Sequence, residues 1–272
     1  YGGVMDVFRQ PKYAYYMFKA QRSPEKQDRL FETGPMVYIA HEMTPFSPTI
    51  VTALTVIVGC LLGGERIFAY YPGMIWSWLT CHLALCPVKV KGRENIDRKK
   101  SYVFVANHQG AFDIFLIYGF LGVPIKWVMK AGIAKIPFVG AACRAAGFIF
   151  VDNSTPKAAA RSVLEAERSL KNGASVVVFP EGSRTYNGKM IRFKKGAYQM
   201  AADQHLQIVP ITLNGPFDVL PIGSLNIHRH KMEMVIHPPI PTEGMDASHK
   251  GLQQMADKTQ DIIASALWEQ YK

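Results

Sequence analysis

Short apolar runs of strand length alternate with helical patterns from Pro87 to the C-terminus, and this alternation constrains the fold more than any other feature. The run SYVFVAN ends at Asn107–His108, SVVVF ends at Pro180–Glu181, and QIVPITL ends at a turn at Asn214–Gly215. Continuous apolar runs of this length are typical of strands buried on both faces. The alternation predicts an α/β fold: a mixed, mostly parallel sheet flanked by helices, with active groups on the loops at the strand ends.

Two further strands and several helices complete this prediction. The segment PVKVKG alternates apolar residues with lysine, as a short edge strand does, and MEMVI forms another strand. Helices are expected from Asp113 onward, over 154–172, around Ala197–Ala202, and from about Lys250 to Gln270.

Basic residues exceed acidic residues: Lys and Arg number 31, Asp and Glu number 21, and the net charge is +10. This balance favours contact with a polyanion, whether nucleic acid, anionic lipid headgroups or a phosphorylated substrate. A nucleic-acid-binding module would need aromatic and basic side chains interleaved on one sheet face or on a recognition helix. The strands here are too apolar for that, so no nucleic-acid partner is expected.

The cysteines and the clustered histidines give no metal signal. Cys60, Cys81, Cys86 and Cys143 have no paired CxxC spacing, so neither a zinc site nor a disulfide framework is expected, and the thiols are predicted to be buried and reduced. The sequence HRH at 228–230 has no supporting carboxylate or cysteine, which favours a solvated basic turn over a metal site.

Two apolar runs precede the first strand of the sheet. The first covers 49–64, and after a charged pair an aromatic-rich run covers 67–85. The first run is just under the ~18 residues of a clean membrane-spanning helix, so a buried core hairpin remains open as the alternative. The second run has tyrosines and tryptophans of the kind that hold a helix at the lipid headgroup boundary, which favours a membrane-associating helix pair over 49–86.

Residues 1–48 are aromatic, punctuated by proline, and without helical or strand periodicity. The segments DVFRQPKYAYYMFKAQ and PMVYIAHEMTPFSP resemble the end of the catalytic barrel and the following linker of family 2 glycoside hydrolases. This piece has none of that family's catalytic carboxylate motifs and is too short to form the barrel, which disfavours a sugar hydrolase. The chain is therefore expected to divide into a non-catalytic appended fragment (1–48), a membrane-associating helical segment (49–86) and a catalytic domain (87–272).

The motif NHQGAFD places His108 and Asp113 five positions apart, at the end of an apolar run. On one continuous helix this spacing rotates the two side chains by roughly 140° relative to each other, so they would not share a face. They can meet across a strand-to-helix turn, where the carboxylate accepts from one imidazole nitrogen and leaves the other as a general base. A structural histidine is the alternative, because this spacing alone is common by chance.

The motif FPEGSRT, residues 179–185, also begins where a buried strand ends. Glu181 and Arg184 are therefore expected on a loop, beside Gly182, which allows a ligand to approach closely. A salt-bridged turn is the alternative for this motif taken alone. Together, the two strand-end motifs indicate an active site.

In chain order, NHQGAFD, GFIFVD, FPEGSRT and VPITLNG resemble the motifs of the glycerolipid acyltransferase family, and the resemblance runs from about Thr49 to the C-terminus. It implies an enzyme that moves a fatty acyl group from acyl-CoA or acyl-carrier protein to the sn-2 hydroxyl of lysophosphatidate. It implies His108 as general base, Asp113 as its orienting partner, and Glu181 with Arg184 as ligands of the acceptor's phosphate. No metal or other cofactor is implied, and the absence of G-x-S-x-G fits direct transfer better than an acyl-enzyme.

One position departs from the family pattern, because this chain has Asn153 where many members have a phosphate-binding arginine. Neutral asparagine cannot make a charge-assisted bidentate contact. Phosphate binding is then expected to rest on Arg184, Lys194 and Lys195, with Lys130 of the KAGIAKIPFVG stretch as a further candidate. The alternative is an acceptor without the phosphate, such as a lyso-amino-acid lipid.

The resemblance also implies a place in the cell and a class of partner. We expect an enzyme at the cytoplasmic face of the cell membrane, integral or monotopic, in contact with an anionic lipid surface and a lysolipid acceptor. A basic lipid-binding module without catalysis is the alternative of another class, and it applies if His108 is not accessible.

Overall fold

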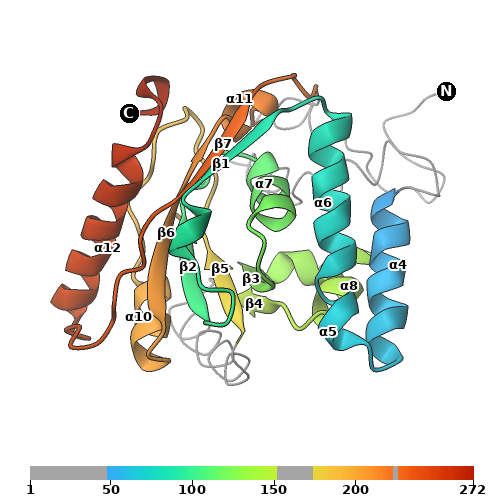
Figure 1. Ribbon diagram of the computed structural model, residues 1–272, viewed down its shortest axis with the longest axis horizontal. Coiled ribbons are helices and arrows are strands. Elements are labelled where there is room, and N and C mark those ends of the chain that lie inside the picture. The colour runs from blue at the N-terminus through green and yellow to red at the C-terminus, as the bar shows by residue number, and fades with distance from the viewer. Residues whose placement is uncertain (1–47, 152–173, 223–225) are drawn as a thin grey trace.

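The computed structural model describes residues 48–151, 174–222 and 226–272. A seven-stranded sheet forms its centre, in the order β1-β7-β6-β2-β5-β3-β4 (Figure 1). The strands are β1 (Val88–Lys91), β2 (Tyr102–Ala106), β3 (Ile125–Lys130), β4 (Ile149–Val151), β5 (Ser175–Val178), β6 (Gln207–Asn214) and β7 (Met232–Ile236). Neighbouring strands are parallel except β6 and β7, which are antiparallel. The prediction of an α/β fold with a mixed, mostly parallel sheet is confirmed.

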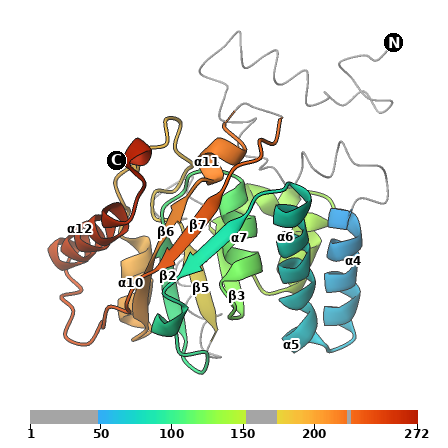
Figure 2. The same ribbon diagram turned by 45° about the horizontal axis from the view of Figure 1, so that its top comes forward.

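Helices cover both faces of the sheet, as Figures 1 and 2 show. Helix α7 lies on one face, with α6 and α4 beyond it, and α10 and α12 lie on the other. The helices are α4 (Pro48–Leu61), α5 (Glu65–Phe68), α6 (Tyr71–Leu83), α7 (Phe112–Phe120), α8 (Val139–Ala145), α10 (Gly196–Asp203), α11 (Pro216–Val219) and α12 (His249–Ser265), with short 3-10 turns η2 (Arg93–Asn95), η3 (Ala131–Lys135) and η4 (Glu269–Tyr271).

Strand β2 shows why its sequence is apolar throughout. Side chains alternate between the two faces of a strand, and both faces of β2 are covered. Phe104 and Ala106 pack into the core under α7, whereas Val103 and Val105 pack into the core under α10 and α12. A strand buried on both sides therefore needs the continuous apolar run that predicted it.

Several predicted elements are confirmed and others need correction. PVKVKG forms β1 at an edge of the sheet, and its burial alternates as expected. The final helix ends at Ser265 instead of near Gln270, because the Asn214 side chain bonds the Ala266 carbonyl at 2.9 Å and the Trp268 N–H at 2.9 Å. These bonds hold the chain after α12 against the end of β6. The helix predicted over 154–172 lies outside the described residues.

The sequence pattern did not predict strands β3 and β4. The sequence of β3, IKWVMK, is interrupted by lysine, and only part of it is buried. Strand β4 has 3 residues, too few for a periodic signal. Both strands form because β5 offers β3 a parallel partner and β3 in turn offers one to β4.

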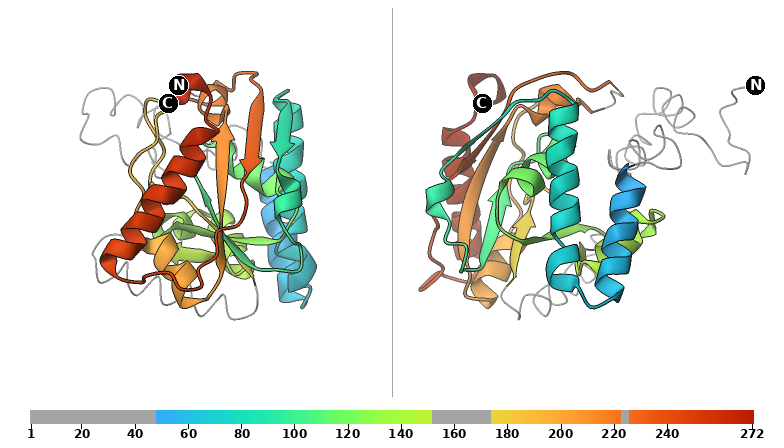
Figure 3. Two further views of the ribbon diagram at one scale, coloured as in Figure 1. Left: turned by 60° about the vertical axis from the view of Figure 1, so that its left-hand side comes forward. Right: turned by 45° about the vertical axis from the view of Figure 1, so that its right-hand side comes forward.

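The two apolar runs before the sheet form the helices α4 and α6, joined by the short α5, and Figure 3 shows them side by side at one flank of the sheet. One side of α4 is buried through Ala53 and Val56, against Ala142 of α8 and Ala146, which caps that helix. The opposite side is exposed, so the alternative of a fully buried hairpin is wrong. Within the described ranges, no helix has the length and apolar character needed to cross a bilayer.

Helix α6 is joined closely to α7. The Tyr118 hydroxyl of α7 donates to the carbonyl of Ala69, the residue that caps α5 just before α6, at 3.0 Å. Gly119 of α7 lies so near α6 that an added Cβ would be 2.8 Å from the backbone nitrogen of Trp78. Cys81, Cys86 and Cys143 are buried as predicted, whereas Cys60 is half-buried. Residues 1–47, which include nearly all of the predicted appended fragment, lie outside the described part, so that prediction stays untested.

Candidate active site

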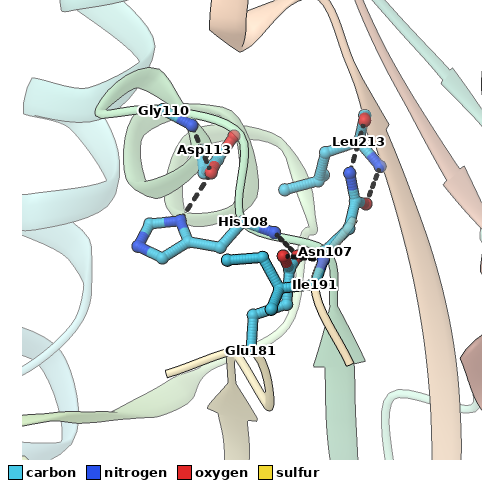
Figure 4. A network of polar contacts seen from close by, with 7 residues as sticks. All are labelled: Asn107, His108, Gly110, Asp113, Glu181, Ile191 and Leu213. Atoms are coloured by element: carbon cyan, nitrogen blue, oxygen red, sulfur yellow. Dashed lines mark hydrogen bonds and ion pairs between the residues drawn. The ribbon is translucent and has the colours of Figure 1, made fainter. Parts of the chain in front are cut away.

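His108 and Asp113 meet across the turn between β2 and α7, as Figure 4 shows. His108 Nδ1 lies 2.7 Å from Asp113 Oδ2, and the Gly110 N–H donates to the same oxygen at 2.9 Å. An ionised carboxylate only accepts hydrogen bonds, so Nδ1 carries the hydrogen and Nε2 presents a lone pair. The His108 side chain is 16% exposed and that of Asp113 is 0% exposed. The expected meeting of these two side chains is present, with the imidazole accessible and the carboxylate hidden.

Asp113 lies in the first turn of α7, where the helix dipole favours a negative charge. Burial raises the pKa of Asp113, and hydrogen bonds from His108 and from the backbone N–H groups of Gly110 and Gln109 oppose that rise. The carboxylate therefore depends on its donors to stay ionised. Those donors are the histidine that it orients and the loop that carries this histidine.

Glu181 joins the second strand-end motif to the first. Its Oε1 accepts from the His108 N–H at 2.6 Å, and its Oε2 accepts from the Ile191 N–H at 2.7 Å (Figure 4). The Thr185 N–H donates to the His108 carbonyl at 3.0 Å, which closes a second link between the two loops. Because β2 and β5 are parallel neighbours, their carboxyl ends bring these loops together.

The surroundings of Glu181 give it a structural role as well as the predicted one. The residue is 3% exposed, and both of its oxygens face backbone N–H groups. Burial raises the pKa of Glu181 to about 7, against the lowering effect of the Ile191 and His108 N–H groups. Glu181 therefore ties two loops together, and its phosphate contact stays a prediction.

Asn107 is a residue to which the sequence analysis gave no role. It is 1% exposed, its amide oxygen accepts from the Leu213 N–H at 2.7 Å, and its amide nitrogen donates to the Leu213 carbonyl at 3.0 Å. The side chain thus continues the pairing of β2 with β6 one residue beyond the strand. The nearby loop is also tightly packed, since an added Cβ at Gly110 would lie 2.8 Å from the Pro216 carbonyl oxygen. The signal for Asn107 in the sequence was its position directly after an apolar run, because a buried strand end needs a polar partner.

The predicted basic residues divide into those near the FPEGSRT loop and those elsewhere. Gly182 has φ +78°, and an added Cβ there would lie 2.6 Å from Lys194 Nζ, so the lysine lies over the glycine. Arg184 is half-buried on the same loop. The Lys195 ammonium contacts the His249 ring at the start of α12, and its phosphate contact stays a prediction.

Two other predicted positions are not brought into this group. Lys130 is exposed at the end of β3, which β5 separates from β2. Asn153 lies outside the described residues. Among the residues that the structure describes, no group of His, Cys, Asp and Glu side chains is arranged to hold a metal ion, and His228 and Arg229 are exposed, as a basic turn would be.

An accessible histidine held by a buried carboxylate at the carboxyl end of a central strand has the geometry of a general base in an α/β enzyme. Residues 87–214 match the model of the family described as Acyltransferase. Both strand-end motifs fall within the matched residues.

Curated relatives carry names that specify the reaction further. The chain is 33% identical over 178 residues to the chloroplastic 1-acyl-sn-glycerol-3-phosphate acyltransferase LPAT1 of Arabidopsis thaliana, across 65% of this chain and 49% of the relative. A 1-acyl-sn-glycerol-3-phosphate acyltransferase of Saccharomyces cerevisiae is 31% identical over 185 residues, across 67% of this chain and 60% of the relative. The chain thus spans about half the length of the first of these relatives.

A solved structure shares the fold. The crystal structure of the 1-acyl-sn-glycerophosphate acyltransferase PlsC from Thermotoga maritima superposes with a TM-score of 0.59, over 94% of this chain and 95% of that chain. The two sequences are 22% identical, so this similarity shows a common fold. The family match covers residues 87–214 and does not include residues 1–48. The resemblance of residues 1–48 to family 2 glycoside hydrolases therefore stays a prediction.

Proposed function

We propose that this protein transfers a fatty acyl group from a thioester carrier, acyl-CoA or acyl-carrier protein, to the sn-2 hydroxyl of lysophosphatidate. The observation that carries the proposal is the pairing of His108 Nδ1 with Asp113 Oδ2 at 2.7 Å, which leaves Nε2 as an accessible base at the strand end. The Acyltransferase family match over 87–214 and the names of the curated relatives support the same reaction.

The proposed reaction has one transfer step. The acceptor hydroxyl oxygen attacks the thioester carbonyl carbon while His108 Nε2 takes the hydroxyl proton. Asp113 stabilises the imidazolium that results. The tetrahedral intermediate then expels the thiolate by breaking the carbon–sulfur bond, and the thiolate takes the proton from the imidazolium. The products are phosphatidate and the free carrier thiol, and His108 returns to its starting state. General base catalysis of this kind contributes about 10²–10⁴-fold in rate.

The phosphate of the acceptor is proposed to bind near the FPEGSRT loop. Arg184 lies on this loop, and Lys194 lies over Gly182. Cations make charge-assisted hydrogen bonds with phosphate oxygens. Arg184 follows Glu181 by three positions, and Lys194 follows Ile191, the second residue that Glu181 bonds, by three positions. A phosphate held there would present the rest of the lysolipid toward the imidazole.

The helix pair is proposed to seat the enzyme on an anionic membrane surface at the cytoplasmic face. Apolar side chains are exposed at Ile75, Leu79 and Leu83, which follow each other at intervals of four along α6 and form one stripe. Helix α4 exposes a comparable set: Val51, Leu54, Val58 and Leu61. An exposed apolar helix face beside a basic domain is typical of interfacial association. Because α6 is joined to α7, the stripe has a fixed position relative to Asp113.

An acceptor panel tests the proposal. Purified protein in mixed micelles is given oleoyl-CoA with lysophosphatidate, a lyso-amino-acid lipid or no acceptor, and free thiol and lipid product are measured. We expect thiol release that requires lysophosphatidate, and in Arg184→Ala a raised KM for lysophosphatidate with a smaller change in kcat. A higher kcat/KM for the phosphate-free lipid would favour the alternative acceptor, and thiol release independent of any acceptor would contradict acyl transfer.

A further inference from the structure

The His108 imidazole lies flat against the ring of Phe179, with ring centroids 4.0 Å apart and planes inclined by 11°. Phe179 is also stacked with Trp127 of β3, with centroids 5.8 Å apart and planes inclined by 23°. Trp127 is itself buried, at 4% exposure. Phe179, the first residue of FPEGSRT, is therefore nearly parallel to both the His108 ring and the Trp127 ring.

The sheet register explains how these rings come together. Strands β2, β5 and β3 are neighbours, and Val177 of β5 is level with Phe104 of β2 and with Trp127 of β3. Residues two positions apart along a strand point to the same face. Phe179 follows Val177 by two positions, so it emerges on the face that Trp127 shares, just beyond the end of β5. His108 emerges beside it just beyond the end of β2.

We propose that Phe179 is a positioning residue that fixes the plane of the His108 imidazole, so that Nδ1 stays on Asp113 and Nε2 stays directed at the acceptor hydroxyl. This inference rests on the proposed function and adds a residue to it. A hydrogen bond at Nδ1 holds one edge of the imidazole but leaves the ring free to tilt about that bond. The flat contact with Phe179 removes this tilt, and Trp127 prevents Phe179 from moving away.

The stack also suits the charge change during the reaction. The face of an aromatic ring is electron-rich, and a cation over that face is stabilised. In the proposed reaction the His108 ring takes the acceptor's proton, with the Asp113 carboxylate at its edge and Glu181 bonded to its backbone N–H. A ring parallel to the imidazole therefore supports the state that forms in transfer.

Phe179→Leu tests the inference, with Phe179→Tyr as the conservative variant and Phe120→Leu as the matched control. Phe120 is also partly buried and also lies parallel to a histidine, His82, at 6.0 Å and 17°, away from the site. From the strength of aromatic pairs, we expect Phe179→Leu to lower kcat about two- to tenfold with KM for lysophosphatidate unchanged. Phe179→Tyr should keep wild-type kcat, and Phe120→Leu should change neither constant.

A spectroscopic measurement on the whole protein tests the stack without relying on activity. With ¹³C-labelled histidine in detergent micelles, the His108 ring protons should resonate upfield because Phe179 shields them, and His108→Gln identifies the signals by their loss. In Phe179→Leu the signals should move downfield. Absence of the upfield position in the wild type would overturn the inference, as would unchanged kcat in a folded Phe179→Leu. If the wild type transfers no acyl group, the proposed function fails, whereas the ring signals still decide the stack.

Discussion

The backbone N–H of His108 donates to Oε1 of Glu181 across 2.6 Å, and this bond joins the two strand-end motifs of the chain. The other oxygen of Glu181 accepts from the Ile191 N–H, so one carboxylate holds the loop of the general base and the segment that leads to α10. A carboxylate in a motif expected to bind phosphate is otherwise hard to explain, since the two anions repel. The position of Glu181 indicates that it holds the His108 loop in place through the backbone.

Glu181→Ala should lower kcat more than it raises KM for lysophosphatidate. The variant leaves the part-buried N–H groups of His108 and Ile191 without their acceptor, at a cost of about 1–3 kcal/mol, so the free energy of unfolding should fall by about that amount. Misplacement of a general base by a fraction of an ångström to 1 Å costs up to about 10²-fold in rate. Glu181→Gln retains one acceptor oxygen and should be intermediate in both quantities. A variant with unchanged kcat and a KM lowered by loss of the negative charge would instead mean that Glu181 faces the phosphate.

The stability contributed by Glu181 should depend on pH. Burial raises the pKa of Glu181 to about 7 in the folded protein, from an ordinary value of 4.5. The folded state therefore holds the proton more tightly than the unfolded state. The associated stability is fully present below pH about 4.5 and is lost as the pH rises through about 7. Melting temperatures of wild type and Glu181→Gln at about pH 5 and about pH 8 check this. From the lower to the higher pH, the melting temperature should fall more in the wild type than in the variant. Equal changes in both proteins would contradict the prediction.

The exposed stripe of α6 should be needed for membrane association and not for folding. Replacing both Ile75 and Leu83 by Glu removes two side chains that contribute about 1.5–3 kcal/mol each when buried in lipid, so binding to anionic vesicles should fall by at least about tenfold. Melting temperature should stay near that of the wild type, since both side chains are exposed. Ile227→Glu is the matched control, because Ile227 is also exposed but lies outside the helix pair. Equal vesicle binding by all three proteins in a flotation assay would contradict the proposed seating.

Removal of residues 1–47 should leave kcat/KM for lysophosphatidate unchanged, because both strand-end motifs and the helix pair lie after this segment. The full chain should not hydrolyse a chromogenic galactoside. Galactoside hydrolysis that is lost on the deletion would show that the segment has a catalytic role of its own.

The sheet was predictable where strands are buried on both faces. Continuous apolar sequence marked β2, β5 and β6, since such a run leaves a strand no exposed side. The same reasoning missed β3, in which Lys126 and Lys130 interrupt the apolar residues. The end of α12 was also misplaced, because it is set by Asn214, a residue far away in sequence. Local pattern therefore predicts elements better than their limits.

The sequence predicted that His108 and Asp113 meet. It did not predict the contacts that Glu181 and Phe179 make with His108. His108 and Asp113 were expected to pair across a turn, and a strand end followed by a helix start is enough to predict this. The bond between Glu181 and a backbone N–H depends on how two parallel strands bring their loops together, and no spacing in the sequence encodes it. The same holds for Phe179, whose contact with His108 follows from the register of β2 and β5.

We propose that His108 is the general base for acyl transfer to lysophosphatidate. Its most direct test is the kcat of phosphatidate formation from oleoyl-CoA and lysophosphatidate by purified wild type and His108→Ala, with His230→Ala as a control outside the site. We predict that His108→Ala lowers kcat by about 10²–10⁴-fold at an unchanged melting temperature, that Asp113→Asn lowers it less, and that His230→Ala retains wild-type kcat. Phosphatidate formation by folded His108→Ala at close to the wild-type rate would contradict a general-base role for His108.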